Sequence, residues 1–429
     1  MPPSSIHHDT RLPNGIRVVT AEMPHMASVA IGAWVGVGGR HEPAKLGGIS
    51  HFIEHILFKG TRRRSAAAIS RAVEGLGGYL NAFTDEEHTC FYARAAAGHW
   101  PVLLDVLADM LLNPRLGPDD IDKERDVILE EWSMYRDQPA ELVHDLLNAA
   151  QFPRHPLGRP VIGSPATLRR IQRPQMKAFL ASHYTAGATV IAAAGNLRHK
   201  ELLAAVGKLA PHFRPGARQG FEPVPSKLHG PRVRLLSKAV EQTNIGLGLR
   251  TASRHDRRRH ALRLLNAILG ENMSSRLFQV VRETHGLTYN IQSSLTCWAD
   301  VGDIVVSAGL DTRDLPKTLR LVVRELDRLM LRPPGMAELN RARDYVLGQF
   351  DLSLEGTESH MMWLGEHALG HESPASPGQV RESLAAVTPA EVRAAAAEFL
   401  GPRHRTMAIV SPRADDRGLA ALLANPSAA

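Results

Sequence analysis

The order of predicted elements repeats once along this chain, with a period of about 200 residues. Each copy opens with an alternating, strand-like run and continues through an apolar helix, a turn containing glycine, two strands and a long helix. The opening runs are SVAIGAWVGVGG at 28–39 and TNIGLGLRT at 243–251. A repeat of this length is too long for a solenoid. It predicts two homologous α+β halves, each an antiparallel sheet packed with helices.

A segment with little hydrophobic periodicity separates the two copies. Residues 214–232 contain four prolines and three glycines. This composition is typical of an extended linker. We therefore expect an N-terminal half at 1–213, a linker at 214–232 and a C-terminal half at 233–429, joined into a clamshell.

The two copies differ most in the first helix. The first copy carries the run His-Phe-Ile-Glu-His from His51 to His55, where the second carries ALRLL. On a helix, His51 and His55 share one face, and Glu54 lies near its edge. Two neutral imidazoles suit Zn²⁺, and the carboxylate can take a proton from water that the metal activates. The spacing is that of the inverted zincin motif. The alternative is a surface helix with two solvated histidines.

A catalytic zinc site needs a third protein ligand and an open position for water. The segment DDIDKERDVILEEWSMYRDQ has strong helical character. Its predicted apolar stripe consists of Val127, Ile128 and Trp132. Glu124 and Glu131 share one face of this helix two turns apart, whereas Glu130 points about 100° away. Either Glu124 or Glu131 could reach a metal, and the alternative is an ordinary charged helix face.

These motifs resemble the pitrilysin and mitochondrial processing peptidase family. The run HFIEHILFKGT is followed by Glu131 within ERDVILEEW. Similar blocks occur at 76–93, 155–164, 183–197 and 274–294, so the resemblance extends from about residue 10 to about residue 412. It implies that His51, His55 and Glu131 hold one Zn²⁺ per chain. It also implies that Glu54 is the general base and that Glu124 supports a ligating histidine.

Candidate substrate-binding residues lie in both halves. Asn81, Ala82 and Phe83 belong to a strand-like segment whose exposed edge could receive a peptide by strand addition. The resemblance places an arginine and a tyrosine, here Arg282 and Tyr289, where family members reach the substrate and its transition state. Without the resemblance, Arg282 is read as a helix-terminal arginine and Tyr289 as a packing residue of a strand. For Asn81, a structural turn residue is the alternative.

Composition and charge limit the classes of partner that we expect this protein to bind. The chain has 44% hydrophobic and 22% charged residues, which is ordinary globular usage. Its net charge of +7 owes much to arginine clusters at 62–64 and 254–259. No aromatic residues interleave these clusters, so we expect solvated surface and no nucleic-acid partner. No stretch approaches 18 apolar residues, so we expect no membrane partner.

The location is predicted from the N-terminus and the cysteines. The start of the chain has neither the apolar core of a signal peptide nor the pattern of a transit peptide. Two cysteines are too few for a disulfide framework and suit a reducing compartment. We expect a cytoplasmic protein, with a mature protein of the mitochondrial matrix as the alternative.

Histidines outside the motif are expected to be structural. His7 and His8 are predicted to belong to a flexible terminus. His360, His367 and His371 share a predicted helix without a carboxylate at metal-ligand spacing, so we expect packing and solvated surface.

The sequence therefore predicts a zinc-dependent endopeptidase that hydrolyses peptides or unfolded, presequence-like polypeptides. The resemblance implies a homodimer. One alternative is a scaffold subunit without proteolysis, against which the intact motif argues. The other is one subunit of a heteromeric processing peptidase, against which the presence of Arg282 and Tyr289 on the same chain argues.

Overall fold

The computed structural model describes residues 6–228, 230–372, 375–413 and 415–425. These residues form two compact units. Unit 1 falls within Met1–Trp132, Arg159–Glu222 and Asp351–Pro374, and unit 2 within Ser133–Gly158, Pro223–Phe350 and Ala375–Ala429. Each unit thus includes one segment from the other half of the sequence. The boundaries 1–213, 214–232 and 233–429 describe the repeat and stay a prediction.

Among the described residues, unit 1 contains a six-stranded sheet in the order β1-β2-β7-β3-β5-β4. Its strands are β1 (Ile6–Arg11), β2 (Arg17–Glu22), β3 (Ser28–Val35), β4 (Tyr79–Thr84), β5 (Thr89–Ala96) and β7 (Thr189–Gly195). Strands β2 and β7 are parallel, and the other neighbours are antiparallel. Two short strands, β6 (Thr185–Gly187) and β8 (Arg214–Ala217), pair in parallel beside it.

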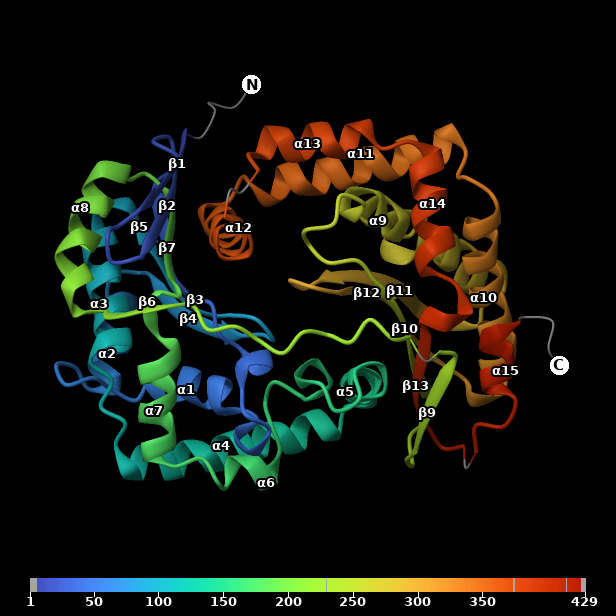
Figure 1. Cartoon of the computed structure of the whole chain (residues 1–429), viewed down its shortest axis with the longest axis horizontal. Coiled ribbons are helices and arrows are strands. Elements are labelled where there is room, and N and C mark those ends of the chain that lie inside the picture. The colour runs from blue at the N-terminus through green and yellow to red at the C-terminus, as the bar shows by residue number, and fades with distance from the viewer. Residues whose placement is uncertain (1–5, 229, 373–374, 414, 426–429) are drawn as a thin grey trace. The chain divides into compact units, whose positions relative to one another are not determined.

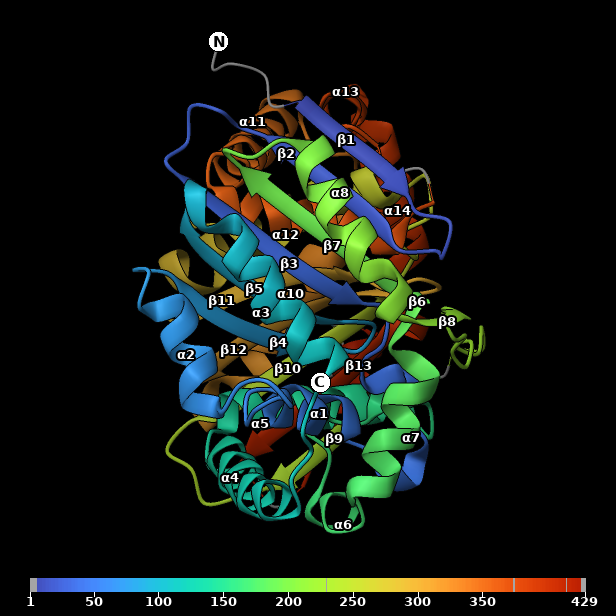
Figure 2. The ribbon, with the colours of Figure 1, turned by 90° about the vertical axis from the view of Figure 1, so that its left-hand side faces the viewer.

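Helices cover both faces of this sheet. Figure 2 shows α3 (Trp100–Leu112) and α8 (His199–Leu209) lying across the strands on one face. The opposite face packs against α12 (Thr357–Gly370), which comes from the second half of the chain. The other helices that lie in unit 1 or begin there are α1 (Ile49–Leu57), α2 (Ala66–Glu74), α4 (Pro118–Arg136), α6 (Pro165–Leu168) and α7 (Arg173–His183).

Strand β3 is apolar because both of its faces are buried. Val29 and Ile31 pack in the core that contains α1 and α3, whereas Trp34 packs against α12. A Cβ atom on Gly32 would lie 2.4 Å from Sδ of Met361 on α12. Glycine at this strand position therefore allows the helix to approach the sheet closely.

In the described part of unit 2, five strands form a sheet in the order β11-β12-β10-β13-β9. They are β9 (Arg232–Ser237), β10 (Thr243–Thr251), β11 (Thr288–Cys297), β12 (Gly302–Leu310) and β13 (Arg405–Ser411). Strands β13 and β9 are parallel, and the other neighbours are antiparallel. This order matches β4-β5-β3-β7-β2 of unit 1, including the position of the parallel pair. The predicted repeat of an α+β unit is confirmed, and each sheet is mixed.

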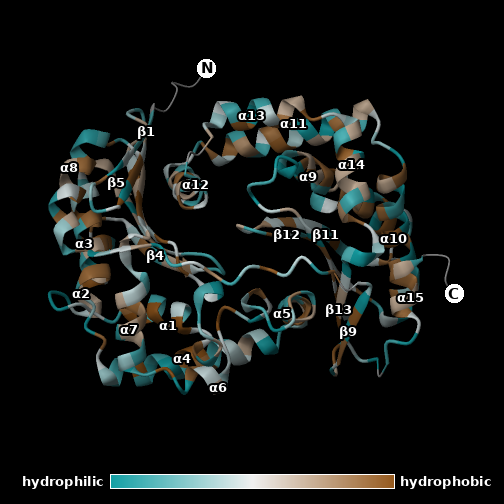
Figure 3. Ribbon diagram, viewed as in Figure 1, coloured by the Kyte–Doolittle hydropathy of each residue, from teal (hydrophilic) through white to brown (hydrophobic). Residues whose placement is uncertain are grey.

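The second sheet also has helices on both faces (Figure 1). Helices α10 (Leu315–Leu331) and α14 (Pro389–Phe399) share one core with it, and α5 (Pro139–Gln151) packs on the other face. The remaining helices are α9 (Arg259–Asn266), α11 (Met336–Ser353), α13 (Pro377–Ala386) and α15 (Leu419–Ala424), with π-helical segments at Ala267–Glu271 and Phe278–Thr284. Figure 3 shows apolar residues gathered on the strands and on the helix faces that meet them.

The N-terminal histidines are part of the sheet, so the predicted flexible terminus is wrong for them. Both lie in β1, which pairs with β2. Nε2 of His7 lies 2.8 Å from Nε2 of His360 on α12. Nε2 of His8 lies 3.4 Å from a carboxylate oxygen of Glu22. Main-chain pairing and the contact with α12 order this segment, and neither is visible in the local sequence.

The predicted solvated arginine surface is also wrong in part. Arg64 donates a 2.6 Å hydrogen bond to the buried carboxylate of Asp109. Arg258 donates to Asp256 and Glu398, at 2.7 and 2.5 Å. These arginines balance carboxylates of their own unit. Across the described ranges, no helix is long and apolar enough to cross a bilayer.

Candidate metal centre

Helix α1 directs its two histidines away from the core. It starts after Gly48, which has a φ of 93°. Phe52, Ile53 and Ile56 are buried in the core of unit 1. This leaves His51 and His55 one turn apart on the opposite side, with side chains 13% and 22% exposed. The predicted pairing of the two imidazoles on one helix face is therefore present.

Helix α4 presents a face of apolar and acidic residues toward the two histidines of α1. Ile121, Glu124 and Ile128 are buried, and Glu131 lies one turn beyond them. Val127 is 50% exposed, so the predicted apolar stripe is wrong at that residue. Glu130 is exposed, as its rotation away from Glu131 predicts.

The three predicted ligands come together. Oε2 of Glu131 lies 3.8 Å from Nε2 of His51 and 3.6 Å from Nε2 of His55. One ligand atom from each residue lies within 4.8 Å of the other two. Tetrahedral zinc with bonds of about 2.0–2.1 Å places its ligand atoms about 3.3 Å apart. Two imidazole nitrogens and one carboxylate oxygen at this spacing fit Zn²⁺.

Glu124 contacts His55 on the side of the imidazole ring opposite the ligand cluster. Nδ1 of His55 lies 2.9 Å from Oε1 of Glu124, and Nζ of Lys59 lies 2.6 Å from Oε2. Burial lowers the pKa of His55, but the Glu124 hydrogen bond and the charges of Glu131 and Glu54 outweigh it and raise the pKa. A proton on Nδ1 donated to Glu124 leaves the Nε2 lone pair directed at the ligand cluster. Glu124 therefore lies where a supporting carboxylate is expected.

His51 has a different environment. Burial, and then the neighbouring His55, lower the pKa of His51 to about 3. Its ring is thus neutral near pH 7, which is the form that binds a metal. Its Nδ1 is buried without a hydrogen-bond partner among the described residues.

Glu54 lies beside the cluster, held by a threonine. The Thr84 hydroxyl at the end of β4 donates a 2.6 Å hydrogen bond to Oε2 of Glu54. Burial raises the pKa of Glu54, and the Thr84 bond opposes that rise. A buried carboxylate with a raised pKa is suited to accept and return a proton. Sequence reasoning missed Thr84, although it ends the strand that contains Asn81.

A second carboxylate fixes the start of α1. Oε2 of Glu42 accepts from the backbone N–H of Gly48, and Oε1 from that of Ser50, both at 2.7 Å. These bonds satisfy donors in the first turn of the helix. Burial raises the pKa of Glu42 to about 7, against the lowering effect of the two bonds. Sequence reasoning missed Glu42 because it precedes the helix by a loop.

The predicted peptide-binding strand is an edge strand. β4 ends the sheet order of unit 1. Asn81 is exposed, and its Oδ1 accepts from the N–H of Ala82 at 2.8 Å. The Phe83 ring packs against those of Trp34 and Tyr92. Main-chain binding of a peptide at this edge stays a prediction.

Arg282 and Tyr289 lie side by side in unit 2, the arginine partly buried and the tyrosine exposed. Tyr289 lies near the start of the edge strand β11 and is 84% exposed. The Arg282 guanidinium lies 5.0 Å from the centre of the Tyr289 ring and 4.6 Å from that of Phe278. The tyrosine hydroxyl and the arginine donors therefore belong to one local group.

Two family profiles match the chain in sequence. The profile described as insulinase, peptidase family M16, matches residues 17–165, which include the candidate metal ligands. The profile described as peptidase M16 inactive domain matches residues 170–346. The division agrees with candidate metal ligands in the first copy of the repeat only.

Several bacterial proteins are similar over nearly the whole chain. One from Mycobacterium tuberculosis, named an uncharacterized zinc protease, is 40% identical over 416 residues, covering 96% of this chain and 94% of the relative. One from Bacillus subtilis with the same description is 33% identical over 399 residues, covering 93% and 97%.

Solved structures share the fold. A Pseudomonas fluorescens protein, described as a peptidase M16 inactive domain, aligns with a TM-score of 0.89 at 20% identity, covering 96% of this chain and 99% of that one. A Helicobacter pylori protease aligns with a TM-score of 0.88 at 20% identity, covering 95% and 100%.

Proposed function

Because the chain belongs to peptidase family M16, we propose that it is a zinc-dependent endopeptidase, with one Zn²⁺ per chain held by His51, His55 and Glu131. The observation that supports this most directly is the grouping of these three ligand atoms within 4.8 Å, beside the buried Glu54. Relatives named as zinc proteases support the same metal.

The proposed chemistry assigns a task to each side chain around the cluster. Zinc at this position would supply Lewis-acid chemistry that acidifies water and polarises a peptide carbonyl. Glu54 takes the proton from the attacking water and passes it to the leaving amine. Thr84 keeps the Glu54 carboxylate in place during both transfers. Glu124 keeps the proton of His55 on Nδ1.

Residues of both units are proposed to act on the substrate. The edge of β4 at Asn81, Ala82 and Phe83 would pair with an extended peptide main chain. Tyr289 would donate to the developing oxyanion, and Arg282 would offer its planar fork to a peptide carbonyl. The proposed substrates are peptides or unfolded, presequence-like polypeptides. A homodimer and a cytoplasmic location are part of the same proposal.

The proposal is tested with a mixed library of quenched peptides of about 10–30 residues, longer than the six-residue strand β4 with which they would pair. Wild type, Glu54→Gln and chelator-treated wild type are assayed side by side, with the zinc content of each determined. Glu130→Gln is the matched control, because this exposed carboxylate is adjacent to Glu131 and outside the cluster.

We expect cleavage by wild type to be lost in Glu54→Gln and after chelation. Added zinc should restore it to the chelated protein, and Glu130→Gln should retain it. Glu54→Gln should still contain zinc. Normal turnover in that variant would refute the assigned base. Tightly bound zinc without cleavage would favour the scaffold or the heteromeric alternative, and a search for a second chain would separate those two.

A further inference from the structure

Lys59 contacts the carboxylate that supports the metal ligand His55. It follows α1 by two residues, and its Nζ lies 2.6 Å from Oε2 of Glu124. Oε1 of the same carboxylate lies 2.9 Å from Nδ1 of His55. The Glu124 side chain is only 6% exposed. With one partner on each oxygen, the plane of this carboxylate is fixed against rotation.

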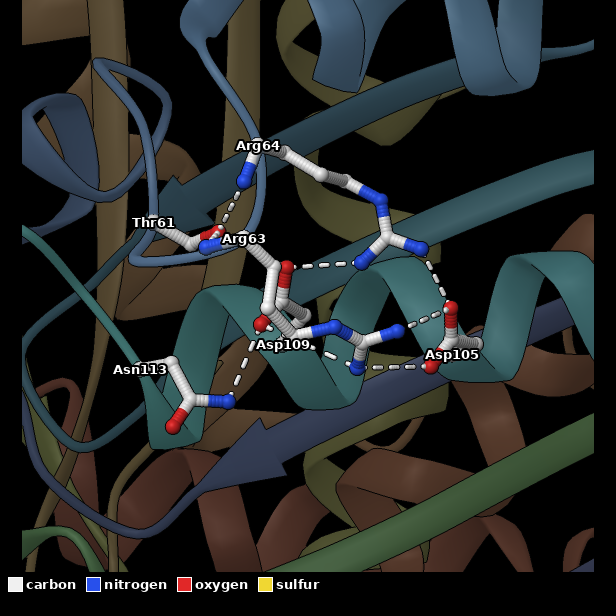
Figure 4. Close-up of polar contacts among 6 residues, drawn as sticks. All are labelled: Thr61, Arg63, Arg64, Asp105, Asp109 and Asn113. Carbon is white, nitrogen blue, oxygen red and sulfur yellow. Dashed lines mark hydrogen bonds and ion pairs between the residues drawn. The ribbon is translucent and has the colours of Figure 1, made fainter.

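The residues after Lys59 are anchored to α3 by a buried aspartate. Figure 4 shows that Thr61 and Arg64 converge on Asp109. The Thr61 hydroxyl and the Arg64 guanidinium donate to Oδ2 of Asp109 at 2.7 and 2.6 Å, and Asn113 donates to Oδ1 at 2.9 Å. The side chain of Asp109 is fully buried. A buried charge with this many donors holds its partners firmly. Residues 59–65 are called the anchored turn below.

The anchored turn also binds the segment that leads into α4. Arg62 N donates to Asn113 O at 2.9 Å, and Arg115 N donates to Gly60 O at 3.0 Å. The Arg115 guanidinium donates to Lys59 O at 3.0 Å and to Asp120 at 2.6 Å, near the start of α4. The end of α1 and the start of α4 are thus joined through one set of bonds. These are the two helices that carry the three candidate ligands.

We propose that Lys59 is a positioning residue for the metal centre. The anchored turn, held by Asp109, sets the position of Lys59. Lys59 orients Glu124 against His55, while the turn sets α1 relative to α4 and so the separation of the histidines from Glu131. The inference rests on the proposed function, because it presupposes zinc at this cluster. An ordinary exposed ion pair contributes only about 0–1 kcal/mol and would leave the cluster unchanged.

The test is zinc affinity, measured by competition with a chromophoric chelator, together with the absorption spectrum of the cobalt-substituted protein. Lys59→Met removes the charge and keeps the length of the stem. Lys123→Met is the matched control, since Lys123 is an exposed lysine next to Glu124 on α4. We expect the zinc dissociation constant to rise about 10–100-fold in Lys59→Met, as for other partners of ligating side chains. Lys123→Met should stay within about twofold of wild type, and Lys59→Arg should recover part of the loss.

The anchored turn is tested with Asp109→Asn, and with Thr61→Val in case the buried change prevents folding. Each should weaken zinc binding several-fold, and by a smaller factor in the Lys59→Met background than in wild type, because both changes act partly through Lys59. Equal affinity of Lys59→Met and wild type would overturn the inference, and so would full additivity of Lys59→Met with Asp109→Asn. A wild-type protein that binds no zinc would instead refute the proposed function.

Discussion

Helices α1 and α9 occupy the same place in the two units but have different chemistry. α1 lies between β3 and β4 in sequence, and α9 lies between the corresponding strands β10 and β11. Both bury an apolar face, with Phe52 and Ile53 in α1 and Leu262 and Leu265 in α9. On its other face α1 has His51 and His55, whereas α9 has no such pair among its residues.

The difference shows that this fold does not depend on the candidate metal-ligating side chains. Unit 2 has the same strand order with an apolar helix at the equivalent place. His51 and His55 lie on the face of α1 away from the core, and Glu54 accepts a hydrogen bond from Thr84. We therefore expect substitutions at the metal centre to remove function with little loss of folding. The following predictions test that separation, from the largest expected effect to the smallest.

Removing one ligand should have the largest effect. His55→Ala should weaken zinc binding by about 4 kcal/mol, on the order of a thousandfold, because one of three ligands is lost. His260→Ala is the control, because His260 is a histidine of the equivalent helix α9. Zinc affinity of the two variants is compared by chelator competition, and the metal-free proteins are compared by urea unfolding. A similar loss of zinc affinity in His260→Ala would contradict the assignment of metal binding to α1 and not to α9.

Unit 2 is predicted to contribute to turnover without binding metal. Tyr289→Phe should lower kcat by about 10²–10³-fold, near 3 kcal/mol, because one donor to the developing oxyanion is lost. Zinc content should remain that of wild type. Tyr345→Phe, on α11, serves as the control for a lost hydroxyl in the same unit. Unchanged kcat in Tyr289→Phe would leave unit 2 without this catalytic role.

The sequence could predict some contacts of the candidate site and not others, depending on the kind of contact. Helical spacing was enough to predict that His51 and His55 share one face, because residues four apart on a helix leave a local pattern. Spacing left Glu124 and Glu131 as alternatives, and only the family resemblance selected Glu131 as the candidate ligand. The contact of Thr84 with Glu54 and that of Glu42 with the first turn of α1 leave no such spacing. They join ordinary residue types across loops, and only the folded chain brings them together. The exchange of α5 and α12 between the units was missed for a similar reason, since an apolar helix face does not encode which sheet it covers.

The N-termini of α1 and α9 should respond to pH in opposite directions. Burial raises the pKa of Glu42 from 4.5 to about 7, so its favourable contribution to folding is complete below pH 4.5 and is lost as pH rises through 7. At about 1.4 kcal/mol per pH unit, the rise of the pKa from 4.5 to about 7 corresponds to a loss of about 3 kcal/mol in the metal-free protein. Before α9, the Arg258 hydrogen bond lowers the pKa of Asp256, so its contribution is lost as pH falls instead.

Urea unfolding of metal-free wild type, Glu42→Gln and Asp256→Asn across pH 4–8 measures this difference. The free energy of unfolding of wild type relative to Glu42→Gln should fall between pH 4.5 and 7. Relative to Asp256→Asn it should fall toward acid pH. A pH-independent difference between wild type and Glu42→Gln would show that Glu42 has the same pKa in the folded and the unfolded chain, and would refute the raised pKa.

Loss of the threonine beside the proposed general base should have the smallest effect. Thr84→Val keeps the shape of the side chain and removes the 2.6 Å hydrogen bond to Glu54. A bond to a charged group contributes about 1.5 kcal/mol, so kcat should fall roughly tenfold while zinc affinity is unchanged. Thr84→Ser should retain most of kcat, and Thr296→Val on the equivalent edge strand β11 should retain all of it. If Thr84→Val had the kcat of wild type, packing alone would hold Glu54, and the functional difference between α1 and α9 would reduce to the ligands and the base themselves.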